Sequence, residues 1–316
     1  MPAIRKFVRR PVRCRHLKLV GISEKTQKRY VTQLKRWFFF MQSQGWGLPT
    51  TAEQVDFAAG EFINELYQES DSYGYACDLV SAIGRFIPRC RRSLTISRSF
   101  LKNWDKTIAR KRALPLPLPL VFAMSGASIV LQRTDMAALL LVGFLGLLRT
   151  SEVVTLKPSQ ILFLGPDHAV ISLANTKTSV RKGSPEQVTI NDPLVCRALR
   201  LAIGRLRPFQ KIYRRPYAAF ANEYRWLAAK FGLSGPRLTP YSLRRGGATW
   251  HFLRYGSLDA TTLRGRWEHS RTARLYIEGA SAELTELQPR PKFAALQTAC
   301  HRLCLRYFDS ITIEAS

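Results

Sequence analysis

The spacing of apolar positions between residues 23 and 112 predicts a group of helices. Intervals of three and four residues place the apolar side chains of each segment on one face. Ser23 is the predicted N-cap of the first helix, and Thr51 with Gln54 forms a predicted capping box for the second. A third helix is expected over residues 72–86, and a fourth follows it. Helices of this number and length predict a small all-α domain.

The fourth helix is expected to carry one basic face and one apolar face. Its basic side chains recur every four residues, at Arg98, Lys102, Lys106 and Arg110. One face can then dock on a core while the other follows phosphates. The alternative is an ordinary solvated basic face. Residues 85–112 hold ten Lys and Arg against one acid, Asp105, and this excess favours contact with DNA.

A proline-rich segment divides the sequence. Residues 113–120 alternate leucine with proline after an initial alanine, which favours an extended, semi-rigid connector. We therefore expect a basic arm over residues 1–22, a helical domain over 23–112 and a linker over 113–120. A second domain over 121–288 and a helical tail over 289–316 follow.

The second domain combines helical periodicity with short segments of strand character. Strands are expected from Ile161 to Phe163, from Ala169 to Leu173 and from Gln187 to Ile190, and the remaining patterns are helical. The expected fold class is therefore mainly α with a small antiparallel β-sheet. Lys177 is expected at or near the tip of that sheet.

Charge narrows the range of partners. The 316 residues contain 49 Lys and Arg against 22 Asp and Glu, a net charge of +27. Such an excess indicates a polyanionic partner, most often nucleic acid. A ribosomal or histone-like binder without chemistry is an alternative that charge alone leaves open. A membrane surface is disfavoured as a partner, because the basic residues are spread over the whole chain. The longest apolar run, Met136 to Leu148, has 13 residues and is too short to cross a bilayer.

The cysteines favour an intracellular protein without a structural metal. Six cysteines are scattered along the chain, and the basic first 22 residues lack the apolar core of a signal peptide. Cys300, His301 and Cys304 lie close together, but no second pair stands at zinc-ligand spacing. We expect neither a metal nor another cofactor.

Six residues along the second domain have the chemistry needed to cut and rejoin DNA without metal or ATP. Arg149 follows an apolar run, and Lys177 lies between two threonines. Tyr241 and Arg244 are three residues apart, and Tyr276 lies nine residues after a tryptophan. The full set in chain order is Arg149, Lys177, Tyr241, Arg244, Trp267 and Tyr276.

In these residues the chain resembles the tyrosine recombinases, the phage-integrase type of site-specific recombinase. Residues 146–152 are similar to the first conserved box of that family, and residues 241–245 to the second. Gly265, Arg266 and Trp267 stand where the family usually has Gly-His, or a tryptophan in some members. The resemblance implies a helical core-binding domain and a catalytic domain that form a clamp around DNA.

The resemblance also implies a role for each residue. Arg149 and Arg244 hold the non-bridging oxygens of the scissile phosphate with charge-assisted hydrogen bonds. Tyr276 is the nucleophile and forms a 3′-phosphotyrosyl bond. Lys177 is the general acid for the leaving 5′-oxygen, although Arg181 and Lys182 lie near it in the sequence.

Three further residues complete the expected site. Trp267 is expected to donate its indole N–H to the phosphate and to support Tyr276. Glu152 is expected to orient an arginine or Tyr241. Tyr241 is the departure, because most relatives have histidine there and tyrosine is a poor base near neutral pH. Arg245, beside Arg244, is expected to contact DNA.

The leading hypothesis is an active recombinase that acts on double-stranded DNA, for integration or excision of a mobile element. The family implies a homotetramer on two synapsed sites, with the C-terminal tail exchanged between protomers. The expected location is intracellular and DNA-associated, in the nucleus of a eukaryote or in the cytoplasm and nucleoid of a bacterium. One alternative is a domesticated, catalytically silent DNA-binding protein of the same fold. Another is an unrelated basic DNA or RNA binder.

Overall fold

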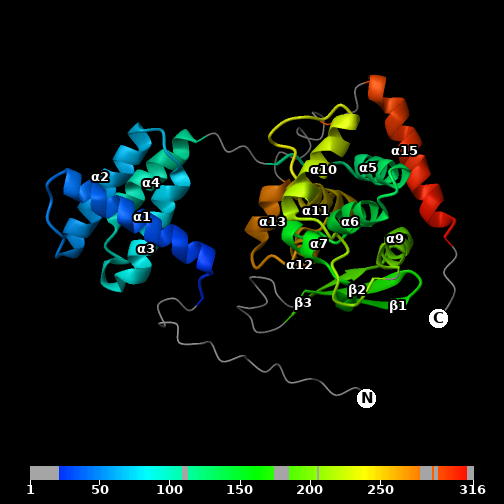
Figure 1. Cartoon of the computed structure of the whole chain (residues 1–316), viewed down its shortest axis with the longest axis horizontal. Coiled ribbons are helices and arrows are strands. Elements are labelled where there is room, and N and C mark those ends of the chain that lie inside the picture. Colours follow the sequence, from blue (N-terminus) through cyan, green and yellow to red (C-terminus); the bar gives the residue numbers. More distant parts are fainter. Residues whose placement is uncertain are drawn as a thin grey trace, which may run out of the picture. The chain divides into compact units, whose positions relative to one another are not determined.

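The computed structural model describes residues 21–108, 113–173, 185–204, 206–277, 287 and 291–311. The chain forms two compact units, divided between Arg110 and Lys111. Each unit has its own hydrophobic core. Both units are drawn in Figure 1, and each is described by itself below. None of the helices in the described ranges combines the length and apolarity needed to cross a membrane.

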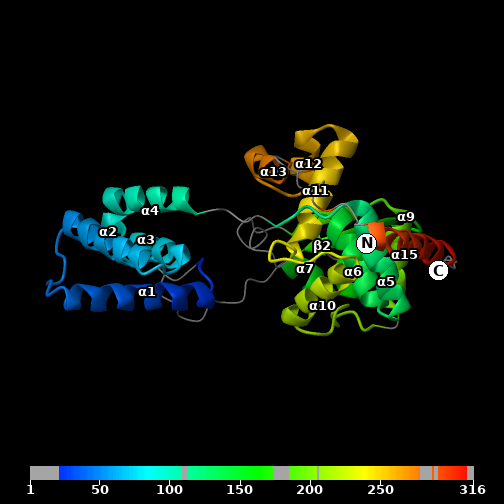
Figure 2. The same cartoon turned by 90° about the horizontal axis from the view of Figure 1, so that it is seen from above.

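The first unit consists of helices, as the sequence predicts. Ser23 caps α1, and the Thr51–Gln54 capping box begins α2. Ser72 caps α3. In Figure 2, α1 and α3 lie side by side, and the two helices are in contact. The four α-helices are α1 (Glu24–Ser43), α2 (Ala52–Gln68), α3 (Tyr73–Phe86) and α4 (Thr95–Thr107).

Helix α4 is capped by a residue of another helix. Its own N-cap residue, Leu94, has no side chain able to accept hydrogen bonds. The carboxylate of Asp56, on α2, accepts from the backbone N–H groups of Ile96 and Ser97 at 2.8 and 2.9 Å. Burial raises the pKa of Asp56. These hydrogen bonds and that of the Ser97 hydroxyl lower the pKa by more, so the net shift is downward. Asp56 thereby fixes where α4 begins and which face it presents.

The second unit is mainly helical with one three-stranded antiparallel sheet of order β1-β2-β3. The strands are β1 (Ile161–Gly165), β2 (His168–Leu173) and β3 (Glu186–Ile190), which confirms the three predicted strands. Ile171 of β2 pairs with Ile161 on one side and with Val188 on the other. The helices are α5 (Leu118–Val130), α6 (Thr134–Leu145), α7 (Thr150–Thr155), α9 (Pro193–Ile203), α10 (Tyr217–Lys230), α11 (Tyr241–Tyr255), α12 (Leu258–Arg264), α13 (Ser270–Ile277) and α15 (Pro291–Asp309).

Helix α6 is the centre of the second unit. Every residue from Met136 to Leu145 is buried, so this helix is surrounded by protein on all sides. It contacts α5, α9 and α11. Its end is therefore a rigid point from which the chain enters the candidate active site. Figure 2 shows α12 and α13 next to each other, and both helices contact α11.

The proline-rich segment is part of the second unit's core. Residues 113–117 are non-helical, and α5 already begins at Leu118. The N–H of Leu116 donates to the carbonyl oxygen of Ser242 at 3.2 Å, and the Leu116 side chain is fully buried. A side chain at Gly246 would overlap the backbone of Leu116. The segment expected as a linker is thus bound along α11.

Helix α15 packs on α5 of its own chain (Figure 1). Cys304 and Phe308 are fully buried in the common core. A Cβ at Gly126 would overlap the carbonyl oxygen of Cys300, so the absence of a side chain allows the close approach. The sequence favours exchange of this tail between protomers, whereas in this structure the tail completes its own unit.

Candidate active site

Arg244 is held between the ends of two helices. Its side chain is the largest among the fully buried ones, in the second turn of α11. Nη1 donates to the carbonyl oxygen of Leu147, just beyond α6, and Nη2 donates to that of Gly265, just beyond α12, at 2.6 Å. Carbonyl groups at helix C-termini carry partial negative charge, which favours a cation there. The guanidinium is therefore fixed in place before any ligand binds.

The two helix ends that hold Arg244 share an unusual backbone. Leu147 and Arg266 each follow the glycine that ends a helix, and each has a positive φ, 46° and 56°. Glycine is the common residue at such a position, because a Cβ makes this conformation costly by about 1 kcal/mol. Residues kept in such conformations cluster at functional sites. Both turns lie against the same arginine.

Arg149 is placed by the turn after α6 and is held by two carboxylates. It is the N-cap residue of α7, with extended backbone angles. Glu152 accepts from its backbone N–H at 2.8 Å and from its Nη1 at 2.6 Å. Glu186, at the start of β3, lies 3.3 Å from the same Nη1. The side chain keeps one third of its surface exposed and can reach a ligand.

Arg266 is a third guanidinium at this site, and the sequence pattern assigned it no role. Its Nη2 donates to Glu152 at 2.7 Å, and its Nε lies 3.7 Å from Glu186. Burial lowers the pKa of Arg266, which the charges of these two glutamates oppose. Glu186 was missed as well, because a glutamate at the start of a strand has no distinctive pattern in the sequence.

Tyr276 lies in the last turn of α13 and is fixed from three sides. Its hydroxyl hydrogen-bonds with the hydroxyl of Tyr241. Its ring lies against Trp267, with centroids 4.8 Å apart and planes inclined by 31°. The hydroxyl of Thr249, on α11, donates to its backbone carbonyl at 3.0 Å. The residue is half-buried, and its hydroxyl is held by the contact with Tyr241.

Trp267 connects the tyrosine to the buried arginine. The Cζ atom of Arg244 lies 4.8 Å from the centre of the indole ring, a distance at which cation–π attraction operates. A Cβ at Gly265 would overlap this ring. The run Gly265, Arg266, Trp267 thus has a physical reason for each residue: the glycine makes room for the tryptophan, which lies against Arg244 and Tyr276, and the arginine binds the two glutamates.

The phenol of Tyr241 is held in its protonated form in this site. Burial raises the pKa of its phenol above the ordinary value, and the hydrogen bond to Tyr276 raises it further. The charges of Arg244 and Arg149 oppose these effects without cancelling them. The phenol therefore stays protonated at neutral pH and cannot accept a proton there.

The structure does not place Lys177 or Arg245 among the contacts described above. Lys177 lies outside the described residues, as do Arg181 and Lys182. Arg245 is buried, and its guanidinium donates to the carbonyl oxygen of Ala113. In this structure Arg245 is a clamp on the proline-rich segment, and its contact with DNA stays a prediction.

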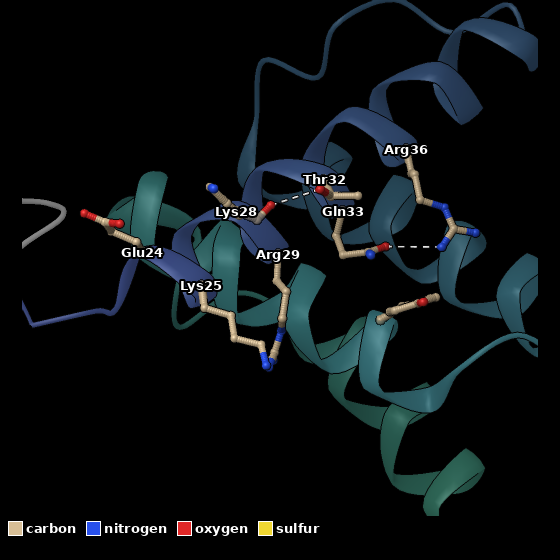
Figure 3. A pocket seen from close by; sticks show the side chains of 8 residues that line it. Glu24, Lys25, Lys28, Arg29, Thr32, Gln33 and Arg36 are labelled. Carbon is tan, nitrogen blue, oxygen red and sulfur yellow. Dashed lines mark hydrogen bonds between the residues drawn. The ribbon is translucent and has the colours of Figure 1, made fainter. Parts of the chain in front are cut away.

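The helical unit offers two basic faces. Arg98, Lys102 and Lys106 are all exposed along α4, while Arg110 lies outside the described residues. Figure 3 shows a second basic face, around an open hollow of about 810 Å³ beside α1. Lys25 and Lys28 line it. The sequence pattern of α1 drew attention to its apolar side, so this second face was missed.

The two arginines of that hollow are tied to acids of α3 and the turn before it. Arg29 pairs with Asp78, with Nε 2.7 Å from Oδ2. Arg36 pairs with Asp71 at 2.5 Å and lies over the ring of Tyr75. These contacts hold α1 against α3. The arginines of the hollow thus serve the fold, which leaves its two lysines as the candidates for contact with DNA.

The fold is that of the tyrosine recombinases, as comparison with solved structures shows. The integrase of transposon Tn1549, in complex with circular intermediate DNA, is similar over 84% of this chain and 94% of its own, with a TM-score of 0.57 and 16% identity. A lambda integrase dimer bound to a core site is similar over 83% of this chain and 91% of its own, with a TM-score of 0.53 and 15% identity. No family model and no curated protein matches the sequence.

Proposed function

We propose that the protein is a site-specific DNA recombinase that cleaves and rejoins strands through a 3′-phosphotyrosyl intermediate. The observation that carries the proposal is the contact series from Tyr276 through Trp267 to Arg244. It brings a tyrosine hydroxyl, held by a second phenol, next to a buried guanidinium. Arg149 stands at the neighbouring helix end, with part of its side chain exposed.

The chemistry follows from these positions. The Tyr276 oxygen gives its proton to solvent water and attacks phosphorus while the bond from phosphorus to the 5′-oxygen breaks. The transition state places additional negative charge on the non-bridging oxygens, and Arg149 with Arg244 stabilises it. The 5′-oxygen leaves with a proton, and we assign Lys177 as the donor of that proton. A 5′-hydroxyl then attacks the phosphotyrosine and restores the phosphodiester and the free tyrosine.

Tyr241 supports the nucleophile in this proposal. Its phenol donates a hydrogen bond to the Tyr276 oxygen and so stabilises the negative charge that develops on it as its own proton leaves. Most tyrosine recombinases are expected to have a histidine at this position, which can accept a proton. The role proposed for Tyr241 is different, because its phenol donates a hydrogen bond. A donor of this kind is most useful when the acceptor is charged, because charge-assisted hydrogen bonds are the strong ones.

We further assign the basic faces of the helical unit to the DNA backbone, with the exposed α4 stripe as the main contact. The solved structures of similar fold include integrases in complex with DNA. Integration or excision of a mobile element is the role we propose, carried out by a tetramer on two synapsed sites. Mass photometry with paired sites tests the assembly, and four protomers per pair is the expected result.

A catalytically silent DNA-binding protein is the second candidate. The observation that favours it is the burial of Arg244, which is 2% exposed and already donates to two carbonyl oxygens. In an active enzyme the phosphate must reach an N–H group of this guanidinium that does not already donate to the two carbonyl oxygens. The two candidates differ in whether a covalent bond to DNA forms.

A nicked suicide substrate separates the candidates. Such a substrate traps the covalent intermediate, because the short leaving strand diffuses away. The active protein is expected to form an adduct that survives denaturing electrophoresis, and Tyr276→Phe is expected to abolish it while DNA binding persists. Tyr255→Phe, at the exposed end of α11, is the matched control and should leave the adduct unchanged. A wild-type protein that binds this DNA tightly without an adduct is the silent protein.

A further inference from the structure

Arg266 and Arg149 compete for the same two carboxylates. Glu152 accepts from Arg149 at 2.6 Å and from Arg266 at 2.7 Å. Glu186 lies 3.3 Å from Arg149 and 3.7 Å from Arg266. How strongly the two carboxylates hold Arg149, the partly exposed arginine proposed to bind the phosphate, therefore depends on how far Arg266 neutralises them.

Arg266 retains donors that nothing satisfies among the described residues. Its side chain is 8% exposed, and its Nε and Nη1 are buried without a hydrogen-bond acceptor there. Burying a guanidinium with some donors unsatisfied is unfavourable. The contacts with Glu152 and Glu186 are therefore the ones that hold this side chain in place.

The backbone of Arg266 indicates that its side chain is needed at this position. Its positive φ of 56° is a conformation that glycine adopts without a steric penalty. The turn after α12 would therefore be more relaxed with glycine in place of arginine. A strained residue that also holds a buried charge points to a function of that charge.

The charges at this site do not cancel. Within the described ranges, the connected groups are three guanidiniums, of Arg149, Arg244 and Arg266, and two carboxylates, of Glu152 and Glu186. Among these five groups, three positive and two negative charges leave one positive charge, to which the proposed general acid Lys177 adds its own. Without Arg266 the group is neutral, and both carboxylates hold Arg149. Burial and then the charge of Arg266 lower the pKa of Arg244, so its field reaches that arginine as well.

We infer that Arg266 is a positioning residue that neutralises Glu152 and Glu186, which frees Arg149 for the phosphate and keeps the five described charged groups at one net positive charge. This inference rests on the recombinase function proposed above. Arg266 acts through the two glutamates, so its effect must depend on them. That dependence separates this role from a direct contact with DNA and from a merely structural one.

Charge rescue tests the inference on the full-length protein with the nicked suicide substrate. Arg266→Gln is expected to lower the initial rate of adduct formation by about 100-fold. Glu186→Gln added to Arg266→Gln restores the net charge of +1, and we expect it to recover at least about tenfold of that rate. Arg254→Gln removes the same charge from the exposed end of α11, serves as the matched control and should stay within about twofold of wild type.

Several outcomes would overturn the inference. The inference is wrong if Arg266→Gln cleaves at the wild-type rate. It is also wrong if the variant with both Arg266→Gln and Glu186→Gln folds but does not recover cleavage. If Arg266→Gln fails to melt cooperatively, Arg266→Lys replaces it, because lysine keeps the charge and should retain at least about a tenth of the rate. A lysine variant that is folded and fully inactive contradicts the role of charge. If the wild-type protein forms no adduct, the recombinase proposal itself is wrong. This outcome differs from those above, in which the wild-type protein cleaves DNA and only the role of Arg266 is contradicted.

Discussion

The hydroxyl groups of Tyr241 and Tyr276 hydrogen-bond to each other where α11 begins and α13 ends. The two rings lie 6.0 Å apart, inclined by 48°. The position at which the sequence departs from the pattern of the tyrosine recombinases is thus in direct contact with the proposed nucleophile. Substitutions at Tyr241 should therefore change the cleavage step more than DNA binding.

Tyr241→Phe removes the hydroxyl but keeps the ring. We expect the rate of adduct formation to fall by about tenfold, the effect of one hydrogen bond of about 1.4 kcal/mol. Tyr241→His is expected to keep or raise the rate, because imidazole can accept a proton near neutral pH. Single-turnover cleavage at saturating protein measures both. A large loss with histidine would show that the site is built around the phenol.

Arg244→Lys should abolish cleavage and also weaken the fold. Lysine cannot reach both the Leu147 and Gly265 carbonyl oxygens in the fork geometry of a guanidinium. We expect at least a 100-fold loss of rate and a loss of about 1–3 kcal/mol in the free energy of unfolding. Chemical denaturation measures the second effect. Arg274→Lys, exposed on α13, is the control and should change neither quantity.

Gly126→Ala should separate α15 from α5. The added methyl group overlaps the carbonyl oxygen of Cys300, and such overpacking costs about 1–3 kcal/mol. Gly165→Ala adds the same methyl group where no atom lies within 4 Å. Thermal melting is expected to show a lower midpoint for the first variant only. Equal midpoints for both would mean that α15 does not pack on α5 in solution.

Alkaline pH should destabilise the second unit through Tyr224. Burial raises the pKa of this phenol above its ordinary value of 10.0. The protonated form is therefore favoured in the folded state, so its contribution is fully present below about pH 10 and is lost as pH rises further. Each pH unit above that point costs about 1.4 kcal/mol.

Tyr224→Phe removes this titration. Its melting temperature should fall less than that of wild type between about pH 9.5 and 11, while the two proteins respond alike between about pH 7 and 9. Tyr217→Phe, exposed on the same helix, should behave as wild type throughout. If Tyr224→Phe loses as much stability as wild type above about pH 10, the titrating group lies elsewhere.

The α4 stripe should account for part of the salt dependence of DNA binding. Lys102 and Lys106 are both exposed on the face away from the core. Replacing both with alanine is expected to reduce the slope of log K against log salt by about 2, roughly one for each phosphate that is no longer neutralised. Filter binding over a salt series measures this slope. Lys25→Ala with Lys28→Ala tests the α1 hollow in the same way, and an unchanged slope in either pair removes that face from the interface.

Much of the local structure could be predicted because its causes are local. The caps at Ser23, Thr51 and Ser72 and the alternation along β2 depend on residues a few positions apart. The end of α4 could not be predicted in this way. Its basic spacing continues to Arg110, whereas the helix ends at Thr107. Its beginning depends on Asp56, a residue 39 positions or more away from its partners.

The candidate site shows the same division. Arg149, Arg244, Trp267 and Tyr276 stand out in the sequence through their order and spacing. Arg266 and Glu186 do not, because their importance arises from contacts between a helix end and a strand that lie far apart in the chain. Arg245 is a related case: spacing identifies an arginine, but only packing decides whether its guanidinium faces solvent or a carbonyl group.

By itself, the sequence determined which elements form and which side chains carry charge or a reactive hydroxyl, since propensity, periodicity and residue chemistry are local properties. Only the tertiary structure decided which charges meet, which arginine is buried and where the proline-rich segment and the C-terminal helix pack. Those outcomes depend on contacts of long sequence separation. Such contacts are set by the way the helices and the sheet pack together, which no local pattern in the chain encodes.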